Sequence, residues 1–210
     1  YNEEETIGTV VTQAMEHVDH VICVDDGSSD SSARIAEACG AIVHRLSVNR
    51  GFGGAFKSFF ANARDIDADC LVILDSDGQH DASDIPKILE PIIQGEADFV
   101  IGSRFTEGGG SEDMPAYRRL GIKVITAASN LSSDLGIQDT QSGFRAFSKR
   151  AIERLRFDSE GMELSLEMLE DANQKDLKIK EIPTVIRYDV PKGSNFTALS
   201  HGFTVLTWAM

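Results

Sequence analysis

The sequence has few cysteines, no long apolar run and a deficit of basic residues. Its 210 residues include three cysteines, Cys23, Cys39 and Cys70, and these share no Cys-x-x-Cys spacing. We interpret them as reduced core thiols, which indicates a cytosolic compartment. No stretch approaches the roughly 18 consecutive apolar residues of a membrane span, so we expect no transmembrane segment.

The deficit of basic residues restricts the possible ligands. Lysine and arginine number 20 against 34 aspartates and glutamates, giving a formal net charge of -14. Because binding to a phosphate backbone needs a basic face, nucleic acid is excluded as a partner. A smaller anionic ligand has to be met locally instead, by a metal ion or by a few placed arginines.

The length fits one domain, residues 1–210, because a single α/β unit of this size buries a sufficient core. Short apolar runs alternate with segments of helical spacing, which predicts βα units and a mostly parallel sheet. The expected strands of the first half are His20–Val24, Ala41–Arg45, Cys70–Leu74 and Phe99–Ile101. The expected helices are Glu4–Met15, Ser31–Cys39, Ala55–Asn62 and Ile85–Ile93.

The two ends of the chain suggest a fragment. The first expected element is a helix, so the strand that precedes such a helix in a βα unit is missing from the amino end. The chain starts at Tyr1 without an initiator methionine and ends in an apolar stretch, which suggests that a C-terminal segment is missing too. In the second half we expect helices over Leu120–Leu135 and from Gly161 through Leu169, and a strand over Lys178–Tyr188. The amphipathic segment Leu199–Ala209 either packs on the domain or contacts a membrane surface.

The most informative candidate site is Asp75-Ser76-Asp77, directly after the expected strand Cys70–Leu74. Open α/β sheets bind ligands at the carboxyl ends of their strands. Two close carboxylates repel unless a cation or a shared proton neutralises them, and oxygen ligands suit Mg²⁺ or Mn²⁺. Gln79 supplies a third oxygen nearby. A pair of solvated turn aspartates is the alternative, since Asp-Ser-Asp-Gly also favours a turn.

A second acidic turn follows the first expected strand. Asp25 and Asp26 lie at its carboxyl end, where a carboxylate can accept hydrogen bonds from a nucleobase or from ribose hydroxyls. Asp30 either joins this site or caps the helix that follows. Asn49 and Gly53 belong to a glycine-rich start of the next helix, where backbone N–H groups can approach a ligand closely.

Several motifs together resemble one enzyme family. They are Tyr1-Asn2-Glu3, Val24-Asp25-Asp26-Gly27-Ser28, Asn49-x-Gly51-x-Gly53-x-Ala55, Asp75-x-Asp77-x-Gln79-His80 and Gly102-Ser103-Arg104-Phe105. In this order and spacing the chain resembles the family 2 glycosyltransferases of the GT-A fold. More narrowly, it is similar to the polyprenyl-phosphate (dolichyl-phosphate) sugar transferases, which have a segment like Asp139-Thr140-Gln141-Ser142-Gly143-Phe144-Arg145. The resemblance implies a single Rossmann-like α/β domain with a mostly parallel, mixed central sheet flanked by helices.

The resemblance also implies roles for individual residues. The nucleotide-sugar would be bound by Tyr1, Asn2, Glu3, Asp25, Asp26, Asn49, Gly53, Asp75 and Ser76. Asp75, Asp77 and Gln79 would hold the metal against the diphosphate. The acceptor would contact Ser103, Arg104 and Arg145, and the catalytic residues would be Asp77, Arg104 and Arg145. For each arginine, a surface ion pair is the alternative.

The implied activity is metal-dependent and inverting transfer of a hexosyl or N-acetylhexosaminyl group from a UDP- or GDP-sugar, with peripheral contact at the cytosolic face of a membrane. The acceptor stays open. A polyprenyl phosphate is already a nucleophile and needs positioning more than a general base. A glycan hydroxyl requires a base, for which Asp139 and Glu163 are the candidates. A non-catalytic nucleotide-sugar-binding domain is a third alternative, which the intact acidic pair disfavours.

One segment departs from the family pattern. Many of the lipid-phosphate enzymes carry an arginine followed by Gly-x-Ser-Lys after the last strand, and residues 187–195 only approximate this arrangement. Arg187 and Lys192 are the candidates for its phosphate-binding role. The segment Tyr188–Val190 and the later His201-Gly202 are similar to archaeal-type members that use a UDP-linked amino sugar.

Overall fold

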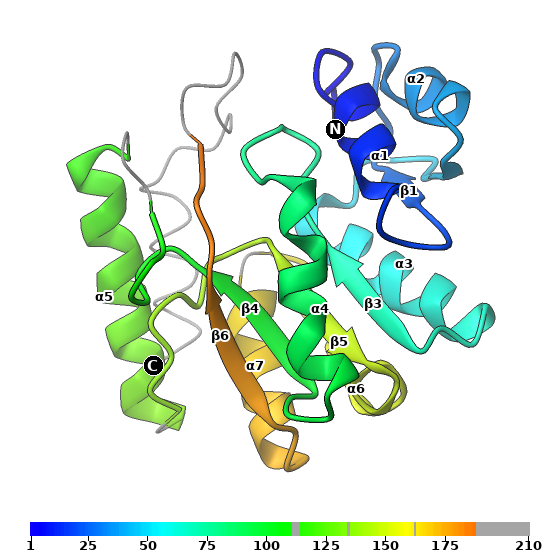
Figure 1. Cartoon of the computed structure of the whole chain (residues 1–210). Helices are drawn as coiled ribbons and strands as arrows, with labels where there is room; N and C mark the ends of the chain where they lie inside the picture. The colour runs from blue at the N-terminus through cyan, green and yellow to red at the C-terminus, as the bar shows by residue number, and fades with distance from the viewer. Residues whose placement is uncertain (111–113, 134, 162, 188–210) are drawn as a thin grey trace.

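A computed structural model of the chain describes residues 1–110, 114–133, 135–161 and 163–187 (Figure 1). Strands and helices alternate along most of it. The strands are β1 (Ile22–Asp25), β2 (Ile42–Arg45), β3 (Cys70–Ile73), β4 (Phe99–Ser103), β5 (Arg145–Ser148) and β6 (Ile179–Pro183). The helices are α1 (Ile7–Ala14), α2 (Ser32–Ala38), α3 (Gly51–Asp65), α4 (Ile85–Ile93), α5 (Ala116–Ser133), α6 (Lys149–Arg154) and α7 (Leu164–Gln174), with a 3₁₀ turn η1 (Ala82–Asp84) before α4.

The strands form two sheets. β1 and β2 pair in parallel, and β3, β5, β4 and β6 form the second sheet in that order. In it β4 and β6 are parallel, whereas β5 runs antiparallel to both of its neighbours. The prediction of a mixed α/β sheet flanked by helices is confirmed. The reversed strand β5 was not predicted, because its Arg-Ala-Phe-Ser sequence has too few apolar residues to show a strand pattern.

The larger sheet is covered on both faces (Figure 1). Strand β4 is buried along its whole length, as expected for a central strand with apolar side chains on both sides. On one face, Phe147 lies with its ring centroid 4.6 Å from Phe99 and 4.9 Å from Phe60 of α3. On the other face, Ile88 of α4 packs against Val100. These contacts fix the direction of the strands whose ends carry the candidate site.

Several helices and strands begin or end at other residues than predicted. Helix α3 begins at Gly51 rather than at Ala55, so the glycine-rich segment is its first turn. Strand β4 continues to Ser103, and β6 ends at Pro183 rather than at Tyr188. Beyond β6 a single parallel bridge joins Val185 to Gly110. The predicted helix over 199–209, together with residues 188–195, lies outside the described residues.

The state of the cysteines and the character of the helices concern two further predictions. The three cysteines are free thiols, as expected. Over the residues described, no helix has both the length and the apolar character needed to cross a bilayer.

Candidate active site

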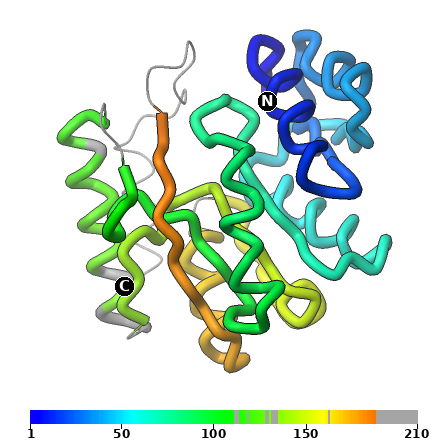
Figure 2. The backbone as a smooth tube through the Cα atoms, in the orientation of Figure 1, coloured from blue at the N-terminus to red at the C-terminus, as the bar shows by residue number. Residues whose placement is uncertain are grey.

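The carboxyl ends of β1 and β3 meet around the first residues of the chain. The backbone N–H of Asn2 donates to Ser28 Oγ (2.9 Å), in the loop after β1. The Thr6 hydroxyl donates to the carbonyl of Ser76 (2.7 Å), in the loop after β3. Figure 2 shows the start of the chain at the same end of the molecule as the loop between β3 and α4. The fold therefore brings the first motif, the β1 loop and the acidic pair to one place.

The amino-terminal segment is held tightly against the β1 loop. Asn2 adopts a positive φ of 56°, and its side-chain oxygen accepts from the Ser29 N–H (2.9 Å). The Glu3 N–H donates to Ser32 Oγ (2.7 Å). The side chain of Tyr1 stays largely exposed beside them. The structure thus places Tyr1, Asn2 and Glu3 together against the loop after β1, and their contact with a nucleotide stays a prediction.

Asp26 binds the backbone at the start of α3. Its two carboxylate oxygens accept from the backbone N–H groups of Arg50 (2.6 Å) and Gly51 (2.8 Å), at the start of α3. A carboxylate in this position satisfies helix N–H groups that have no partner in the helix, and it is attracted by the positive end of the helix dipole. The Gly51 N–H is shared with Asn49 Oδ1 (3.1 Å). The ribose or base contact predicted for Asp26 and Asn49 would have to use their remaining lone pairs.

Asp25 is similarly engaged. Its Oδ1 accepts from the Ser28 N–H (3.0 Å), and its Oδ2 lies 3.1 Å from the Arg45 guanidinium. The carboxylate is nearly buried, so it shapes the turn after β1 from below rather than lining open space. Its predicted nucleotide contact is untested. Asp30 accepts from the N–H and hydroxyl of Ser32 and from the Glu4 N–H (3.2 Å), so it joins the amino-terminal segment to the turn before α2, whose N-cap residue is Ser31.

Gly53 was predicted to contact the nucleotide-sugar, and this stays a prediction, although its backbone N–H is already engaged. Its N–H donates to the Glu160 carbonyl (2.8 Å) across the α3–α7 contact. A Cβ atom at this position would lie 2.5 Å from both Glu160 Cα and the Ser159 carbonyl oxygen. The residue is glycine because two backbones approach closely here, which is a packing role.

The acidic pair Asp75 and Asp77 lies in the turn that follows β3, as the sequence predicts. Asp77 Oδ1 accepts from the Gln79 N–H (2.9 Å), which closes the turn. Gln79 itself is nearly buried, and its side-chain Nε2 has no hydrogen-bond partner among the residues described. A buried amide without a partner is costly, so this group points to a ligand or water in the same place. The three residues share one turn, in which Asp77 is bonded to the Gln79 backbone and its charge acts on Asp75.

Burial and the negative charge of Asp77 raise the pKa of Asp75 to about 6. Asp75 as a whole residue is exposed, yet its carboxylate packs so closely on Gly143 that a Cβ atom there would overlap it. The enclosed carboxylate is the group that titrates. The nearby charge of Glu3 acts in the same direction. The site thus holds more negative charge than it can stabilise alone, and this favours a cation.

The Asp75→Asn substitution is expected to stabilise the metal-free protein. Since the pKa of Asp75 in the folded chain lies above its ordinary value of 3.8, folding becomes less favourable as the pH rises through about 6. The substitution removes this loss, by about 1 kcal/mol at pH 8, because solvent reaches part of the residue and screens the repulsion. Urea unfolding in EDTA at pH 8 and pH 4 measures it. The gain should vanish at pH 4, and an equal gain at both values would contradict the prediction.

Arg104 was predicted to face the acceptor, and the structure shows it in a buried ion pair. Its Nε and one terminal nitrogen each lie 2.6 Å from the oxygens of Asp139, and its backbone N–H donates to the same carboxylate (3.0 Å). Asp139 is fully buried. Fork-like pairing of this kind holds an arginine firmly. The acceptor role of Arg104 stays a prediction, whereas Asp139 is unsuited to be a general base, because both of its oxygens already bind Arg104.

Arg145 and Ser103 are fully buried, and their predicted contact with the acceptor stays a prediction. The Arg145 guanidinium donates to the carbonyls of Ser142 and Thr140 (2.8 Å each), and burial lowers its pKa to about 10. Both bonds hold the loop in which Gly143 meets Asp75. Arg145 therefore acts on the acidic pair indirectly, as a positioning residue.

Two features of the site were not found in the sequence. One is the bond from Thr6 to the loop of the acidic pair, for which a lone threonine in a helix cap gives no signal. The other concerns His80, which stacks edge-on against Phe144 with ring centroids 5.2 Å apart. Burial, followed by the charge of Arg104, lowers the pKa of His80 to about 4, so its imidazole is neutral at pH 7. It supports the turn as an aromatic side chain.

Comparison with known proteins gives the family. Residues 1–156 match the family described as Glycosyl transferase family 2. This chain belongs to that family. It is also 32% identical to the UDP-N-acetylglucosamine–dolichyl-phosphate N-acetylglucosaminyltransferase of Methanococcus voltae, covering 93% of this chain and 87% of that protein. It is therefore a glycosyltransferase, and the resemblance seen in its motifs is confirmed.

Two further proteins are similar to this chain. A dolichol-phosphate mannosyltransferase of Pyrococcus furiosus is 30% identical over 87% of this chain and 53% of that protein. Glucosyl-3-phosphoglycerate synthase from Mycobacterium tuberculosis, solved in complex with Mn²⁺, uridine diphosphate and phosphoglyceric acid, superposes with a TM-score of 0.77 at 21% identity. The superposition covers 99% of this chain and 73% of the synthase chain, and it confirms the GT-A fold.

Proposed function

We propose that this glycosyltransferase moves a sugar, with inversion, from a UDP- or GDP-sugar to a polyprenyl phosphate, and that it uses Mg²⁺ or Mn²⁺ held by Asp75, Asp77 and Gln79. The observation that carries the proposal is the acidic pair at the carboxyl end of β3, where the pKa of Asp75 is raised to about 6. The relatives whose names include dolichyl or dolichol phosphate support the acceptor.

The residues present fit a divalent cation. Among the described residues no group of three or more His, Cys, Asp or Glu side chains is arranged to hold a metal by itself. Mg²⁺ and Mn²⁺ are commonly held by one or two carboxylates, with substrate phosphates and water completing the shell, and Asp75 with Asp77 matches this pattern. The third ligand would be Gln79 Oε1, because the unpartnered Nε2 is an N–H donor and cannot bind a cation. When bound, the ion would neutralise charge on the departing nucleoside diphosphate as a Lewis acid.

The chain's own residues orient the donor. We propose that Tyr1 and Glu3 contact the nucleoside, with Asn2 and Asp26 fixing the two backbone segments between which it lies. Asn2 is tied to Ser29, and Asp26 to the start of α3, so neither segment has to be ordered when the donor binds. Preorganised contacts of this kind lower the entropy cost of binding and reaction.

The chemistry of the acceptor decides whether a base is needed. Of the two candidate bases, Asp139 is occupied by Arg104. The Glu163 Oε1 accepts from the Gly161 N–H (3.1 Å), whereas its buried Oε2 has no hydrogen-bond partner among the residues described, so Glu163 stays the candidate base for a hydroxyl acceptor. A sugar hydroxyl needs a base in reach, whereas a phosphate monoester is already a nucleophile at neutral pH. The backbone of Arg187 donates to the Gln79 carbonyl (2.9 Å), which anchors this exposed arginine next to the acidic turn. We propose Arg187 as a phosphate contact.

A polyprenyl acceptor would bring the enzyme to a membrane. We propose peripheral contact at the cytosolic face, with α5 as the candidate surface. Tyr117, Leu120 and Val124 are 69%, 64% and 46% exposed, and their spacing places them along one side of the helix. Lys123 of the same helix is also exposed, and its positive charge suits anionic headgroups.

An assay with purified protein tests the proposal. UDP- and GDP-sugars are paired with polyprenyl phosphate in detergent or with soluble saccharides, in the presence of Mn²⁺, Mg²⁺ or EDTA. We expect a lipid-linked product of inverted anomeric configuration, and its loss in EDTA. Product formed on a saccharide but not on the lipid would overturn the acceptor assignment. Undiminished turnover in EDTA would overturn the metal assignment.

A further inference from the structure

Thr6 joins the first residues of the chain to the acidic turn. Its hydroxyl donates to the carbonyl of Ser76 (2.7 Å), a residue 70 positions away in the sequence. That carbonyl belongs to the planar peptide unit between Ser76 and Asp77, so holding its oxygen restricts the position of the Asp77 Cα atom. On the other side of the turn, the Gln79 N–H donates to Asp77 Oδ1 (2.9 Å). The turn is therefore held both by its own bond and by Thr6.

The backbone of Thr6 extends this connection to the start of α2. The N–H groups of Thr6 (3.2 Å) and Ile7 (2.9 Å) donate to the Glu3 carbonyl. The Glu3 N–H donates to Ser32 Oγ (2.7 Å), at the first residue of α2. A series of hydrogen bonds thus runs from Ser32 through Glu3 and Thr6 to the acidic turn. It joins the segment proposed to contact the nucleoside to the turn proposed to hold the cation.

The Thr6 hydroxyl is not used as a helix cap. Thr6 is the N-cap residue of α1, and an N-cap threonine usually accepts a hydrogen bond from an N–H of the first helical turn. Here the side chain makes no such bond, and the backbone adopts φ -118° and ψ -31° rather than the extended conformation of a usual N-cap. The hydroxyl donates to another loop instead. Its contribution is therefore to the arrangement of the site rather than to the stability of α1.

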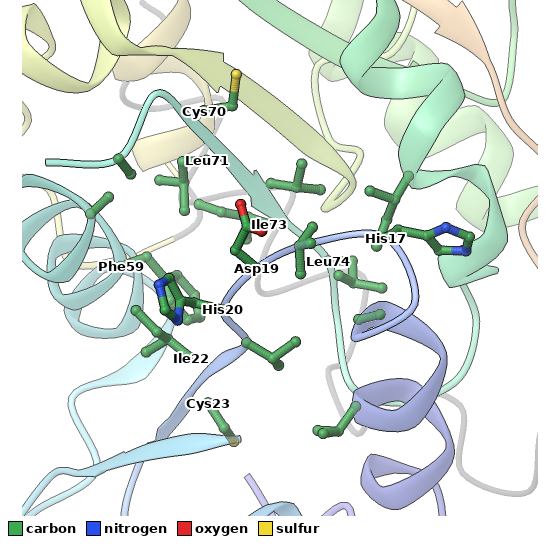
Figure 3. Close-up of a pocket in the computed structure, with 18 of the residues that line it drawn as sticks. His17, Asp19, His20, Ile22, Cys23, Phe59, Cys70, Leu71, Ile73 and Leu74 are labelled. Carbon is green, nitrogen blue, oxygen red and sulfur yellow. The ribbon is translucent and has the colours of Figure 1, made fainter. Parts of the chain in front are cut away.

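The Thr6 side chain is also separate from the apolar packing of α1. A cavity of about 750 Å³ lies between the β1 and β3 segments, and Figure 3 shows Cys23 and Ile73 among the side chains around it. Ile7, the first residue of α1, lines this cavity, whereas Thr6 does not. A substitution of Thr6 therefore removes the hydrogen bond to Ser76 without changing the lining of the cavity.

We propose that Thr6 is a positioning residue, which holds the acidic turn in a fixed place relative to the segment Tyr1–Glu3. The inference rests on the proposed function, because that function assigns the cation to the turn and the nucleoside to the segment. A nucleoside diphosphate has to reach both at once. When the two parts are already in place, neither has to be ordered on binding, so the cation and the nucleotide strengthen each other's binding.

The test compares Thr6→Val, which keeps the branched shape and removes the hydroxyl, with Thr6→Ser, which keeps the hydroxyl. Thr12→Val is the matched control, because the exposed Thr12 hydroxyl donates to the Gly8 carbonyl (2.8 Å) within α1. The first measurement is amide hydrogen exchange of residues 75–79 without metal or nucleotide. Thr6→Val should speed this exchange by about three- to tenfold, the factor that one net hydrogen bond represents. Thr6→Ser and Thr12→Val should match the unmodified chain.

The second measurement is calorimetry with UDP and with GDP, each with and without Mn²⁺. In the unmodified chain the ion should strengthen the binding of one of the two nucleotides. In Thr6→Val this strengthening should fall by about three- to tenfold, because the turn no longer stays in register with the nucleoside-binding segment. Thr6→Ser should restore it, and Thr12→Val should leave it as it is.

Three results would overturn the positioning role. They are unchanged exchange of the turn in Thr6→Val, equal effects of Thr6→Val and Thr12→Val, and a Thr6→Ser variant that behaves like Thr6→Val. An unmodified chain in which Mn²⁺ strengthens the binding of neither nucleotide would overturn the coupling together with the proposed metal site. The two failures are distinguishable, because hydrogen exchange of the turn is measured without metal.

Discussion

The Asp77→Asn substitution is expected to lower kcat by about 10²- to 10³-fold, the usual effect of removing one group that stabilises charge in a transition state. Asparagine is isosteric, and its side-chain oxygen can still accept from the Gln79 N–H, so the turn should persist. What is lost is a negative ligand for the cation opposite the departing diphosphate. Initial rates at saturating Mn²⁺ and donor measure the effect.

Asp69→Asn is a suitable control for this experiment. Asp69 precedes β3 at its amino end, and its side chain is 93% exposed and lies 3.9 Å from Lys149. The two substitutions thus make the same chemical change at opposite ends of one strand. Asp69→Asn should keep the full rate. Full activity of Asp77→Asn, with a circular dichroism spectrum like that of the unmodified chain, would contradict the proposed metal site.

The Asp139→Ala substitution is expected to destabilise the fold by about 3–5 kcal/mol, because it leaves a buried arginine without its counter-charge. The side chain of Arg104 is 5% exposed and that of Asp139 is fully buried, so water cannot replace the lost carboxylate. Three hydrogen bonds from Arg104 disappear together. Urea unfolding followed by circular dichroism measures the change.

Glu96→Ala is the matched comparison, since it removes an exposed ion pair. Glu96 and Lys180 pair at 2.7 Å with side chains about half-exposed, and such pairs contribute about 1 kcal/mol or less. An Arg104→Leu, Asp139→Leu double variant should recover much of the stability lost in Asp139→Ala, because no unpaired charge remains buried. Equal costs for Asp139→Ala and Glu96→Ala would show that the buried pair does not exist in solution.

The double variant also separates the two roles considered for Arg104. If Arg104 contacts the acceptor, a folded double variant should show a raised KM for polyprenyl phosphate or a reduced kcat, with unchanged donor affinity. If Arg104 only pairs with Asp139, the folded double variant should retain its kinetics. Donor affinity is measured by calorimetry with the nucleoside diphosphate and Mn²⁺.

The parts of the fold that could be predicted were those with a local pattern. The apolar run before Asp75 marked β3, and the following acidic turn could only stand at its carboxyl end. The apolar spacing of Ile85–Ile93 likewise matched α4 at both ends. In contrast, β5 was missed, because its burial comes from α4, α6 and the strands on either side rather than from its own composition.

The roles of the charged residues were harder to predict. Arg104 and Arg145 were both expected at the acceptor, yet one is paired with an aspartate 35 residues away and the other binds two carbonyls of its own loop. Gly53 was assigned to the ligand, and the structure shows that it also makes room for the backbone of Glu160. A sequence gives the type and spacing of such residues but not the partner that satisfies them.

The sequence by itself determined the alternation of strands and helices as far as β4, the acidic turn after β3 and the family, because each depends on neighbours within a few positions. The tertiary structure decided which carboxylates form hydrogen bonds or ion pairs within the protein and which lie close to another carboxylate. Asp26 and Asp139 are satisfied by donors distant in sequence, whereas Asp75 meets Asp77 and the pKa of Asp75 rises to about 6. Two like charges held close together in a partly enclosed site favour a cation, and only folding creates that condition.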